Sequence, residues 1–377
     1  MYKRLKEVSK LQRINPKYIS MREYTQKISE NNYPKRIFSG IQPTGNLHLG
    51  NYLGAVQKWI QLQDNGENVI WSIVDMHSIT LPHDPKELSN NILKMTATLL
   101  ACGIDPKKSI LFQQSTVDTH AQLCWILGCL TSFTRLARLP QFKEKSETLK
   151  SIPLSLYIYP VLQAADILLY KATDVPVGQD QVQHIQLAQE LAIKFNKKFG
   201  NTFPSICVVE DASQRIKSLR DPSKKMSKSD QTSKSRLDIL DKPEILIEKL
   251  KKAVTDFTSK VTYEPEKRPG VSNLVTIHSM LTGKSPDQIC SEVEGLDTGK
   301  YLLIYKLVLA DVIVEKLNPI REEFSRLIRE PAYLQEVLRN GTERATEIAS
   351  DSWCEVRNKI GFENDIFHVN KSIRNII

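Results

Sequence analysis

The sequence predicts an α/β protein, in which a parallel β-sheet with helices on both faces is followed by a C-terminal all-α domain. From residue 36, short apolar segments of strand length alternate with longer amphipathic segments, a succession typical of a parallel sheet. After about residue 236 only amphipathic segments of helical length remain. The chain has 377 residues, which suits two domains or one large domain with an appendage.

The first half of the predicted sheet contains three strands joined by two helices. The continuous apolar run VIWSIV indicates a strand that is buried on both faces. Gly103 is expected to end the second helix, because glycine is favoured just past helix C-termini. In chain order the elements are strand Arg36–Gly40, helix Asn51–Gln63, strand Val69–Val74, helix Pro85–Gly103 and strand Ser109–Gln113. This order is Rossmann-like.

The rest of the chain continues the sheet and then becomes helical. Residues 119–150 are expected to be helical, then basic and loop-like through Gln141–Ser146. The next elements are helix Val161–Tyr170, a turn with a short strand at Asp174–Gly178, helix Gln181–Phe195, strand Ile206–Val209 and a charged, flexible loop at Asp221–Thr232. The all-α part is predicted to contain helices Lys242–Val254, Ser272–Thr282, Tyr301–Asn318, Ile320–Arg329 and Tyr333–Ile360. We therefore predict domains at 36–235 and 236–377, after an extension at 1–35.

The positive charge of the chain is concentrated at its N-terminus. Of the net charge of +9, residues 1–36 carry +7, from ten Lys or Arg and three Glu. An RNA-binding surface on the folded body must therefore come from local patches rather than from the global charge. Residues 1–35 have two readings. They are a basic, Ser-bearing transit peptide, against which Glu7, Glu23 and Glu30 count, or a disordered or loosely helical basic tail.

Composition excludes some other classes of protein. The hydrophobic content of 41% and the charged content of 25% are ordinary for a globular enzyme. No uncharged apolar stretch reaches about 18 residues, so no membrane span is expected. The six cysteines are dispersed and none forms a C-x-x-C pair. We expect reduced thiols and no metal site.

Two segments carry the residue types of phosphate chemistry. Pro43–Gly54, read PTGNLHLGNYLG, lies between the first predicted strand and helix, where backbone N–H groups and a helix N-terminus can receive phosphate. It matches neither a dinucleotide-binding nor a Walker pattern, and alone it can equally be a turn with a helix cap. Lys224–Ser229, read KKMSKS, is a lysine-rich loop that could close over a triphosphate. Alone it can equally be a solvated charge run.

Taken together and in this order, HLGN and KMSKS match the paired HIGH and KMSKS signatures of class I aminoacyl-tRNA synthetases. The resemblance continues through FSGIQPTGNLHLGNYLG, SIVDMHSIT, ACGIDPKKSILFQQS, YPVLQAADILLY, VPVGQDQVQH, PSKKMSKSD, KAVTDF and PGVSNL, which are similar to tryptophanyl-tRNA synthetases. It runs from about Lys35 to Phe362. In the sequence of its HLGN and LQAAD segments, the chain most resembles the animal mitochondrial branch of the family. This resemblance implies a location in the mitochondrial matrix, with the cytoplasm as the alternative.

The resemblance implies an ATP site and a set of catalytic groups. The positions that match ATP contacts are Gln42, Pro43, Thr44, Gly50, Asn51, Gly178, Gln179, Asp180, Ile216, Lys225, Met226, Ser227, Lys228 and Ser229. Lys225 and Lys228 are implied as catalytic, together with His48, the first histidine of the HIGH signature. Lys143 and Lys145 either approach the phosphates or the tRNA acceptor end, or belong to a plain basic surface loop.

The resemblance also implies a tryptophan pocket, formed by Phe38, His77, Tyr159, Gln163, Asp166 and Gln181. Asp166 is the residue expected to decide amino-acid identity. A carboxylate in an otherwise apolar helix is costly without a partner, and the indole N–H offers one donor. Such sites discriminate by roughly 10⁴-fold or more. The alternative is a helix acid paired with a local Lys or Arg.

Two positions in the pocket depart from the family pattern. Gln163 stands where bacterial enzymes typically carry methionine against the indole. Gln179 stands where the family often has glutamate in GEDQ. These departures bear on how the indole and the ribose are held, and they leave the reaction class unchanged.

The implied reaction has two steps. The tryptophan carboxylate, which is already ionised at pH 7, attacks the α-phosphorus of ATP with the help of Mg²⁺, and the aminoacyl group then moves to tRNA(Trp). The family further implies an anticodon-binding role for residues 236–377 and a homodimer with its interface in an insertion at about 115–185. The rivals are a tyrosyl-tRNA synthetase or small-molecule adenylyltransferase of the same superfamily, and an RNA-binding protein that has lost catalysis.

Overall fold

The computed structural model describes residues 33–139, 151–210, 216–228, 230, 232–294 and 301–362. The chain divides into two units, Met1–Pro34 and Lys35–Ile377. All elements below belong to the second unit. The prediction for residues 1–35 concerns a segment that lies almost wholly outside the described residues.

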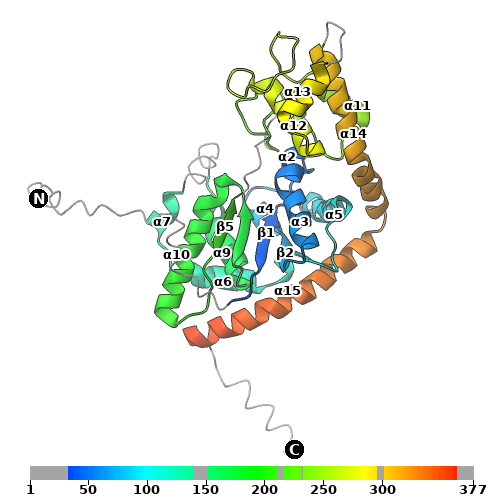
Figure 1. Ribbon diagram of the computed structural model, residues 1–377. Helices are drawn as coiled ribbons and strands as arrows, with labels where there is room; N and C mark the ends of the chain where they lie inside the picture. Colours follow the sequence, from blue (N-terminus) through cyan, green and yellow to red (C-terminus); the bar gives the residue numbers. More distant parts are fainter. Residues whose placement is uncertain are drawn as a thin grey trace, which may run out of the picture. The chain divides into compact units, whose positions relative to one another are not determined.

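Five parallel strands form the central sheet, in the order β3-β2-β1-β4-β5 (Figure 1). The strands are β1 Ile37–Ile41, β2 Val69–Ile73, β3 Ile110–Gln113, β4 Asp174–Val177 and β5 Cys207–Glu210. This confirms the predicted Rossmann-like parallel sheet. The chain leaves β1 toward β2 and β3 on one side and returns to β4 on the other. In such sheets, ligands bind at the carboxyl ends of the strands where the order reverses, here between β1 and β4.

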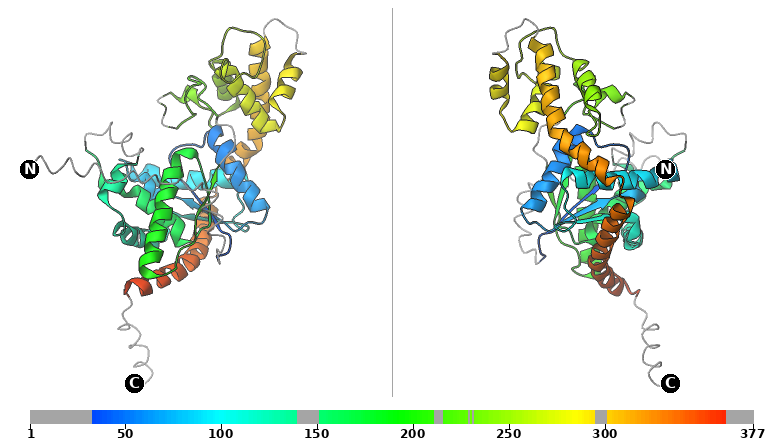
Figure 2. Two further views of the ribbon diagram at one scale, coloured as in Figure 1. Left: turned by 60° about the vertical axis from the view of Figure 1, so that its left-hand side comes forward. Right: turned by 90° about the vertical axis from the view of Figure 1, so that its right-hand side faces the viewer.

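Helices cover both faces of the sheet (Figures 1 and 2). They are α2 Leu49–Asn51, α3 Gln57–Asp64, α4 Asp75–Ser78, α5 Pro85–Cys102, α6 Thr119–Gly128, α7 Phe133–Ala137, α9 Leu154–Leu169 and α10 Val182–Phe199. Successive side chains of β2 pack into the hydrophobic cores on opposite faces of the sheet, because side chains alternate between the two faces along a strand. Trp71 packs with residues of α3 and α5, whereas Ile70 packs with residues of α9 and α10.

Helix α9 begins earlier than the sequence predicts. We expected a helix from Val161, but α9 begins at Leu154 and contains Pro160. A proline inside a helix removes a hydrogen bond and ordinarily marks a boundary. Here the residues before it, including Leu156 and Tyr157, are buried, and α9 packs against α6 and α10. Tertiary packing thus outweighs the local signal.

The C-terminal part is helical, as predicted. Its helices are α11 Pro243–Lys251, α12 Pro269–Thr282, α13 Pro286–Glu294, α14 Tyr301–Leu327 and α15 Pro331–Ile360. The prediction of two helices separated at Pro319 is wrong, because α14 runs through that proline without interruption. Leu317, Ile320 and Leu327 are buried on both sides of it, so one continuous apolar stripe keeps the helix intact. The short helix α13 was not predicted.

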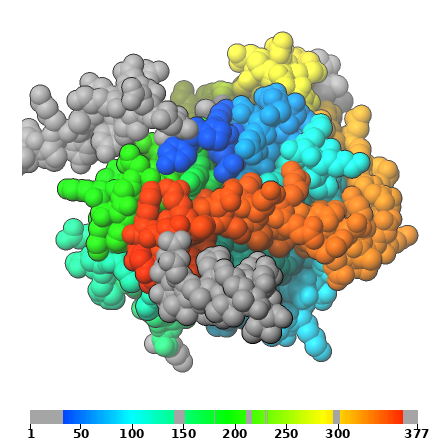
Figure 3. Space-filling view, turned by 90° about the horizontal axis from the view of Figure 1, so that it is seen from below, coloured from blue at the N-terminus to red at the C-terminus, as the bar shows by residue number. Residues whose placement is uncertain are grey.

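The last helix lies against the edge of the sheet. Helix α15 packs along β3, and Figure 3 shows this helix, in orange and red, extending across one face of the molecule. A Cβ atom at Gly341 would lie 1.8 Å from the carbonyl oxygen of Leu111, so only glycine allows this approach of helix and strand. Covering an edge strand protects its backbone from pairing with other chains. The domain boundary near residue 236 stays a prediction.

The remaining expectations concern cysteines and membranes. Cys102, Cys124, Cys129, Cys207, Cys290 and Cys354 are all free thiols. Within the described residues, no helix is both long and apolar enough to cross a membrane.

Candidate active site

The first motif forms the start of a short helix behind β1. His48 is the N-cap residue of α2, and its Nδ1 accepts a hydrogen bond from the Asn51 backbone N–H at 3.2 Å. The residues on either side pair with a later segment. The Leu49 N–H donates to the Leu237 carbonyl at 2.7 Å, and the Ile239 N–H donates to the Leu47 carbonyl at 2.9 Å. The HLGN segment is therefore anchored to the chain just beyond the KMSKS loop.

There is little space between Gly50 and His48. A Cβ atom at Gly50 would lie 3.0 Å from His48 Nδ1, so a side chain there would push against the imidazole. The helix continues as a π-helical segment, Tyr52–Val56, a feature often found at functional sites. Asn51 Oδ1 is buried and has no hydrogen-bond partner among the described residues. This vacant acceptor fits the predicted role of Asn51 as a ligand contact.

His48 is not set up to accept a proton. Burial is the main cause that lowers its pKa to about 3, and the nearby charges of Lys228, Lys225 and Arg236 lower it further. The imidazole is therefore neutral at pH 7. Its Nδ1 already accepts a hydrogen bond, so Nε2 carries the hydrogen and can donate. His48 can thus offer a neutral hydrogen bond to a phosphate oxygen, but it cannot act as a general base through Nδ1.

The KMSKS loop begins from a short antiparallel pair of backbone segments, 216–218 and 224–226. The Met226 N–H donates to the Ile216 carbonyl at 3.1 Å, and the Ser218 N–H donates to the Lys224 carbonyl at 2.9 Å. Ile216 and Met226 are both buried in the core that includes α3 and α5. This pair, which we call the stem, places the lysines of the loop at the edge of that core.

The structure brings three predicted ATP-binding segments together. Lys228 Nζ donates to the Thr44 carbonyl at 2.8 Å, which joins the KMSKS loop to the first motif. Lys225 Nζ lies 3.7 Å from Asp180 Oδ1, which joins the loop to the segment after β4. Both groups of that ion pair are more than half exposed. Two cationic groups thus converge near the β1–β4 switch point.

Lys228 differs electrostatically from an ordinary surface lysine. Burial is the main cause that lowers its pKa to about 8; Arg236 lowers it further, and Asp238 opposes the shift. At pH 7 the ammonium is still mostly present, and a triphosphate would raise its pKa, because a nearby negative charge favours the charged form. An anionic ligand would therefore extend the charged form of Lys228 to higher pH.

Two groups that hold this loop were missed by the sequence analysis. Arg236 donates through Nη1 to the carbonyls of Lys228 at 3.4 Å and Asp230 at 3.3 Å, and through Nε to Asp238 Oδ1 at 3.1 Å. Asn273 of α12 bonds to the backbone of Lys217. Neither belongs to a motif that predicts a contact with the loop, so only the fold reveals them.

A second cluster surrounds Asp166 on the other face of the sheet. Its Oδ1 accepts from Gln114 Nε2 and from His120 Nδ1, both at 2.7 Å, and its Oδ2 lies 2.8 Å from His77 Nε2. His120 Nε2 in turn lies 2.8 Å from the Tyr170 hydroxyl. The alternative of a local Lys or Arg partner is wrong, because the partners come from α4, α6 and the 3₁₀ turn directly after β3. Gln114 and His120 were not predicted.

These partners keep Asp166 ionised although it is 2% exposed. Burial alone would raise the pKa of this carboxyl. Hydrogen bonds from His120 and His77 outweigh burial and hold the pKa well below its usual range. A carboxylate has about four lone-pair sites, and three are used by the described groups. Oδ2 retains one site for a further donor.

The other predicted pocket residues form an adjoining network. The Tyr159 hydroxyl lies 3.3 Å from His184 Nε2. His184 Nδ1 lies 3.0 Å from both Gln163 Oε1 and Gln181 Oε1, and Gln163 Nε2 donates to Gln181 Oε1 at 3.3 Å. His184 is a further group that the sequence analysis missed. Because two amide oxygens face Nδ1, that nitrogen carries the hydrogen, and Nε2 accepts from Tyr159.

Aromatic packing connects the two parts of this pocket. The rings of His77 and Tyr159 meet edge to face with their centroids 6.3 Å apart. Phe38 of β1 stacks on Tyr170, with ring centroids 5.5 Å apart, and is itself buried. The predicted pocket residues are therefore brought together on one face of the sheet, adjacent to its carboxyl edge.

The remaining predicted positions have different outcomes. Gln42 and Thr44 are exposed in the loop after β1, and Pro43 between them is buried. Gly178 follows β4. Gln179 begins a short 3₁₀ turn. Ser229, Lys143 and Lys145 lie outside the described residues, so their roles stay predictions.

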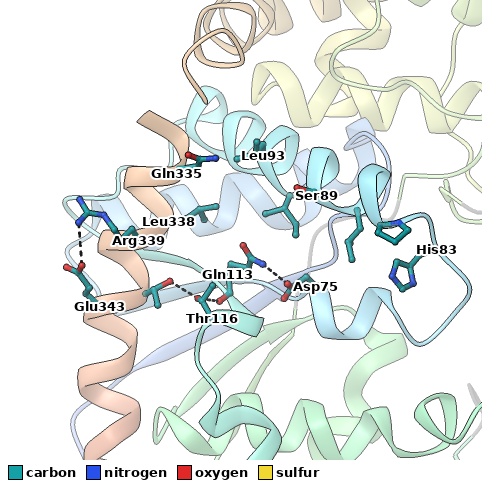
Figure 4. Close-up of a pocket in the computed structure, with 14 residues that line it drawn as sticks. Asp75, His83, Ser89, Leu93, Gln113, Thr116, Gln335, Leu338, Arg339 and Glu343 are labelled. Carbon is teal, nitrogen blue, oxygen red and sulfur yellow. Dashed lines mark hydrogen bonds and ion pairs between the residues drawn. The ribbon is translucent and has the colours of Figure 1, made fainter. Parts of the chain in front are cut away.

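A separate cavity of about 580 Å³ lies between α5, the end of β3 and α15 (Figure 4). Its wall includes Asp75, which accepts hydrogen bonds from Gln113 Nε2 at 2.7 Å and from the Ser115 N–H at 3.0 Å. The next residue, Gln114, bonds instead to Asp166. The end of β3 thus separates this cavity from the pocket, and the predicted site residues do not line it. Within the described residues, no group of three or more His, Cys, Asp or Glu could hold a metal ion.

Comparison with known proteins agrees with this geometry. The family model for class I tRNA synthetases (W and Y) matches residues 30–300. The chain is 44% identical over 329 residues to the tryptophan–tRNA ligase of Caldanaerobacter subterraneus, which covers 87% of this chain and 98% of the relative. It is 45% identical over 329 residues to that of Wolinella succinogenes, with the same coverage.

Solved structures give the same result. The tryptophanyl-tRNA synthetase of Mycoplasma pneumoniae matches with a TM-score of 0.78 and 32% identity, over 88% of this chain and 99% of the other. That of Campylobacter jejuni, complexed with ADP and tryptophan, matches with a TM-score of 0.75 and 30% identity, over 86% of this chain and 99% of the other.

Proposed function

Because this chain belongs to the class I tRNA synthetase family for tryptophan and tyrosine, we propose that it is an ATP-dependent ligase that joins L-tryptophan to tRNA(Trp). It first forms tryptophanyl-adenylate and pyrophosphate from tryptophan and ATP. It then transfers tryptophan to the 3′ end of the tRNA, for use in translation. The single observation that carries this function is the contact of the KMSKS loop with the first motif, through Lys228 and Thr44.

The adenylation step needs positioning and charge stabilisation rather than a general base. The attacking carboxylate is already ionised at pH 7. Negative charge accumulates on the phosphates as pyrophosphate leaves, and preorganised cations there are the main source of rate enhancement in such reactions. Lys225 and Lys228 would supply two such cations near the carboxyl ends of β1 and β4. The neutral imidazole of His48 adds a hydrogen-bond donor.

Tryptophan is the substrate that the Asp166 cluster fits best. The vacant lone-pair site of Oδ2 can accept the indole N–H. Phenylalanine lacks this donor, and binding it would leave the ionised carboxylate with a missing partner. Tyr159 and Gln181 are proposed to receive the ammonium group of the amino acid. The departures at Gln163 and Gln179 concern how the indole and ribose are held.

Mg²⁺ is proposed to enter the site together with ATP. This ion keeps several of its waters and commonly binds through substrate phosphates rather than through an all-protein cage. The two lysines of the loop, Lys225 and Lys228, suit phosphate oxygens and not the metal. The oxygens of ATP and water would therefore supply its ligands.

Amino-acid-dependent exchange of pyrophosphate into ATP tests the proposed function. Tryptophan should support exchange with a kcat/KM at least about 10³-fold above that of tyrosine or phenylalanine, because a site built for a hydrogen bond rejects analogues that lack it. Exchange with tyrosine alone would contradict the assignment and favour the tyrosyl rival. Absence of exchange with any amino acid would favour the RNA-binding rival.

A homodimer is proposed through the predicted insertion at 115–185. Trp125 on α6, Phe133 on α7 and Leu154 on α9 are 75%, 75% and 71% exposed, and α6 and α7 both contact α9. Clustered exposed apolar side chains mark protein interaction surfaces. Trp125→Asp should produce monomers in analytical ultracentrifugation. Ile245→Asp, at an exposed apolar position on α11, is the matched control; a monomeric wild type would overturn the proposal.

Two further roles remain proposals. Residues 236–377 are proposed to contact the anticodon, because RNA-binding proteins recognise splayed, single-stranded bases by stacking and hydrogen bonds.

The mitochondrial matrix is proposed as the compartment. The support is the +7 charge of residues 1–36 and the resemblance of the HLGN and LQAAD segments to the animal mitochondrial branch. The relatives compared above are bacterial. A reporter fused to residues 1–35 should enter mitochondria, and a diffuse cytosolic signal would favour the cytoplasm.

A further inference from the structure

The stem of the KMSKS loop is held by a side chain from the C-terminal helical part. Asn273 lies in α12 and is 5% exposed. Its Oδ1 accepts a hydrogen bond from the Lys217 backbone N–H at 2.8 Å, and its Nδ2 donates to the Lys217 carbonyl at 3.0 Å. One side-chain amide thus satisfies both backbone groups of a single residue.

The geometry of the stem explains why these two groups are available. In an antiparallel pair, alternate residues direct their N–H and C=O groups toward the partner and away from it. Ile216 and Ser218 bond toward the 224–226 segment. Lys217, which lies opposite Lys225 in the pair, directs its groups to the other side. Asn273 occupies that side as a third strand would.

A second contact joins the same segment to the helical part. The Val254 N–H donates to the Leu219 carbonyl at 2.8 Å. Helix α12 in turn packs tightly against the backbone at Val254, because a Cβ atom at Gly270 would lie 2.3 Å from its carbonyl oxygen. The stem is therefore attached at Lys217, and the chain directly after its first segment at Leu219, to one unit composed of α12 and the chain before it.

We propose that Asn273 is a positioning residue for adenylate formation, which fixes the stem and thereby the approach of Lys225 and Lys228 to the triphosphate. This rests on the function proposed above. Asn273 does not touch the reacting atoms itself. It acts through the backbone of Lys217. The neighbour of Lys217 along the chain, Ile216, and the residue opposite it in the stem, Lys225, are both predicted ATP contacts. Its loss should therefore affect ATP and leave tryptophan binding intact.

The test uses two variants of Asn273 in the full chain. Asn273→Asp keeps an acceptor for the Lys217 N–H, but places a carboxylate oxygen against the Lys217 carbonyl. Asn273→Leu has a similar volume and removes both hydrogen bonds. Each should lower kcat/KM for ATP in tryptophan-dependent pyrophosphate exchange by about tenfold or more, as expected for a lost buried hydrogen bond. The Kd for tryptophan should stay within about twofold, which also reports a folded pocket.

Ser272→Ala provides the matched control. Ser272 is the adjacent residue of α12 and is also buried, and its Oγ accepts a hydrogen bond from the Glu264 N–H at 2.9 Å. This variant loses a comparable bond without touching the stem, so its kcat/KM for ATP should equal that of the wild type even if its thermal stability falls.

Three outcomes would overturn the inference: unchanged ATP kinetics in both Asn273 variants, equal losses for ATP and tryptophan, or an equal ATP defect in Ser272→Ala. None of these would affect the proposed function, which depends on exchange by the wild type. A wild type that shows no tryptophan-dependent exchange would instead contradict the proposed function itself.

Discussion

The predicted tryptophan pocket and the KMSKS loop differ in how they hold their charged groups. Asp166 is almost fully buried, and its partners Gln114, His77 and His120 lie on the 3₁₀ turn after a β-strand and on two helices. Lys225 of the KMSKS loop is more than half exposed, and it forms a long ion pair with Asp180. The first site is preorganised before any ligand arrives, whereas the second has charges that remain available.

Under the proposed function, this difference assigns substrate selection to the Asp166 cluster and rate acceleration to the KMSKS loop. Selection requires groups that stay rigid, because a wrong substrate must leave a buried group unpaired. Acceleration requires cations that meet charge as it develops, and loops that close over substrate supply them. Variants in the two regions should therefore give opposite kinetic signatures.

The largest effect is expected from Asp166→Ala. It removes the acceptor for the indole and leaves the donors of Gln114, His77 and His120 without their shared partner. The kcat/KM for tryptophan should fall by about 10³-fold or more, with ATP affinity nearly unchanged. Pyrophosphate exchange at varied tryptophan and varied ATP measures both. Equal losses would remove Asp166 from its role in selection.

The next largest effect is expected from Lys228→Ala. Loss of a preorganised cation should lower kcat for adenylate formation by about 10²- to 10³-fold, while the Kd for tryptophan stays unchanged. Lys224→Ala is the matched control, because Lys224 lies in the same segment but is 77% exposed and pairs with Asp221. Similar losses in the two variants would mean that general charge, and not position, drives the rate.

A smaller effect is expected from pH. The pKa of Lys228 is lowered to about 8, so the ammonium is present below pH 8 and lost above it. The kcat/KM for ATP, which reports the free enzyme, should therefore fall as pH rises through 8, by up to about tenfold per unit. Lys228→Arg should abolish this step, because arginine stays charged. A step that persists in this variant would belong to another group.

The same shift has a consequence for stability. The pKa of an unfolded lysine is about 10.4, above the folded value. Between pH 8 and that value the unfolded chain binds more protons, so the contribution of Lys228 to the free energy of unfolding should rise with pH over this window. Urea unfolding of the wild type and of Lys228→Met across this range measures the difference, and identical slopes would exclude the shift.

The smallest effect is expected from Gln163→Met. The change removes the contacts of Gln163 with His184 and Gln181, but Gln181 Oε1 still faces His184 Nδ1. The KM for tryptophan should rise only about two- to fivefold, as for one partly compensated hydrogen bond. Steady-state exchange kinetics measure it. A loss of tryptophan specificity as large as that in Asp166→Ala would mean that the Asp166 carboxylate is not the main determinant of substrate selection.

The sequence predicted the sheet well because each strand has a local signal. Short apolar runs bounded by turns identified all five strands in order. The helix boundaries predicted near Pro160 and Pro319 are wrong. At both positions, burial of the flanking residues outweighs the hydrogen bond that a proline removes from the helix. Local patterns report the cost of a proline but not the packing that compensates for it.

The site was predictable in part. Asp166 stood out as a charge in an apolar helix, and the lysines stood out as a cluster. Gln114 and His120, in contrast, lie 52 and 46 residues from Asp166 along the chain, and no spacing rule joins them. Asn273 and Arg236 were missed for the same reason. Asn273 lies in the quoted segment PGVSNL, but nothing in that segment indicates which backbone its side chain supports.

The most direct test of the division between the two regions is equilibrium binding of tryptophan and of its benzothiophene analogue, which replaces the indole N–H by sulfur at nearly constant shape. The wild type should bind tryptophan about 10²-fold or more tightly than the analogue, because the analogue leaves Asp166 Oδ2 without its donor. Asp166→Ala should bind the two nearly alike, and Lys228→Ala should keep the full preference. Equal binding of both ligands by the wild type would contradict the account.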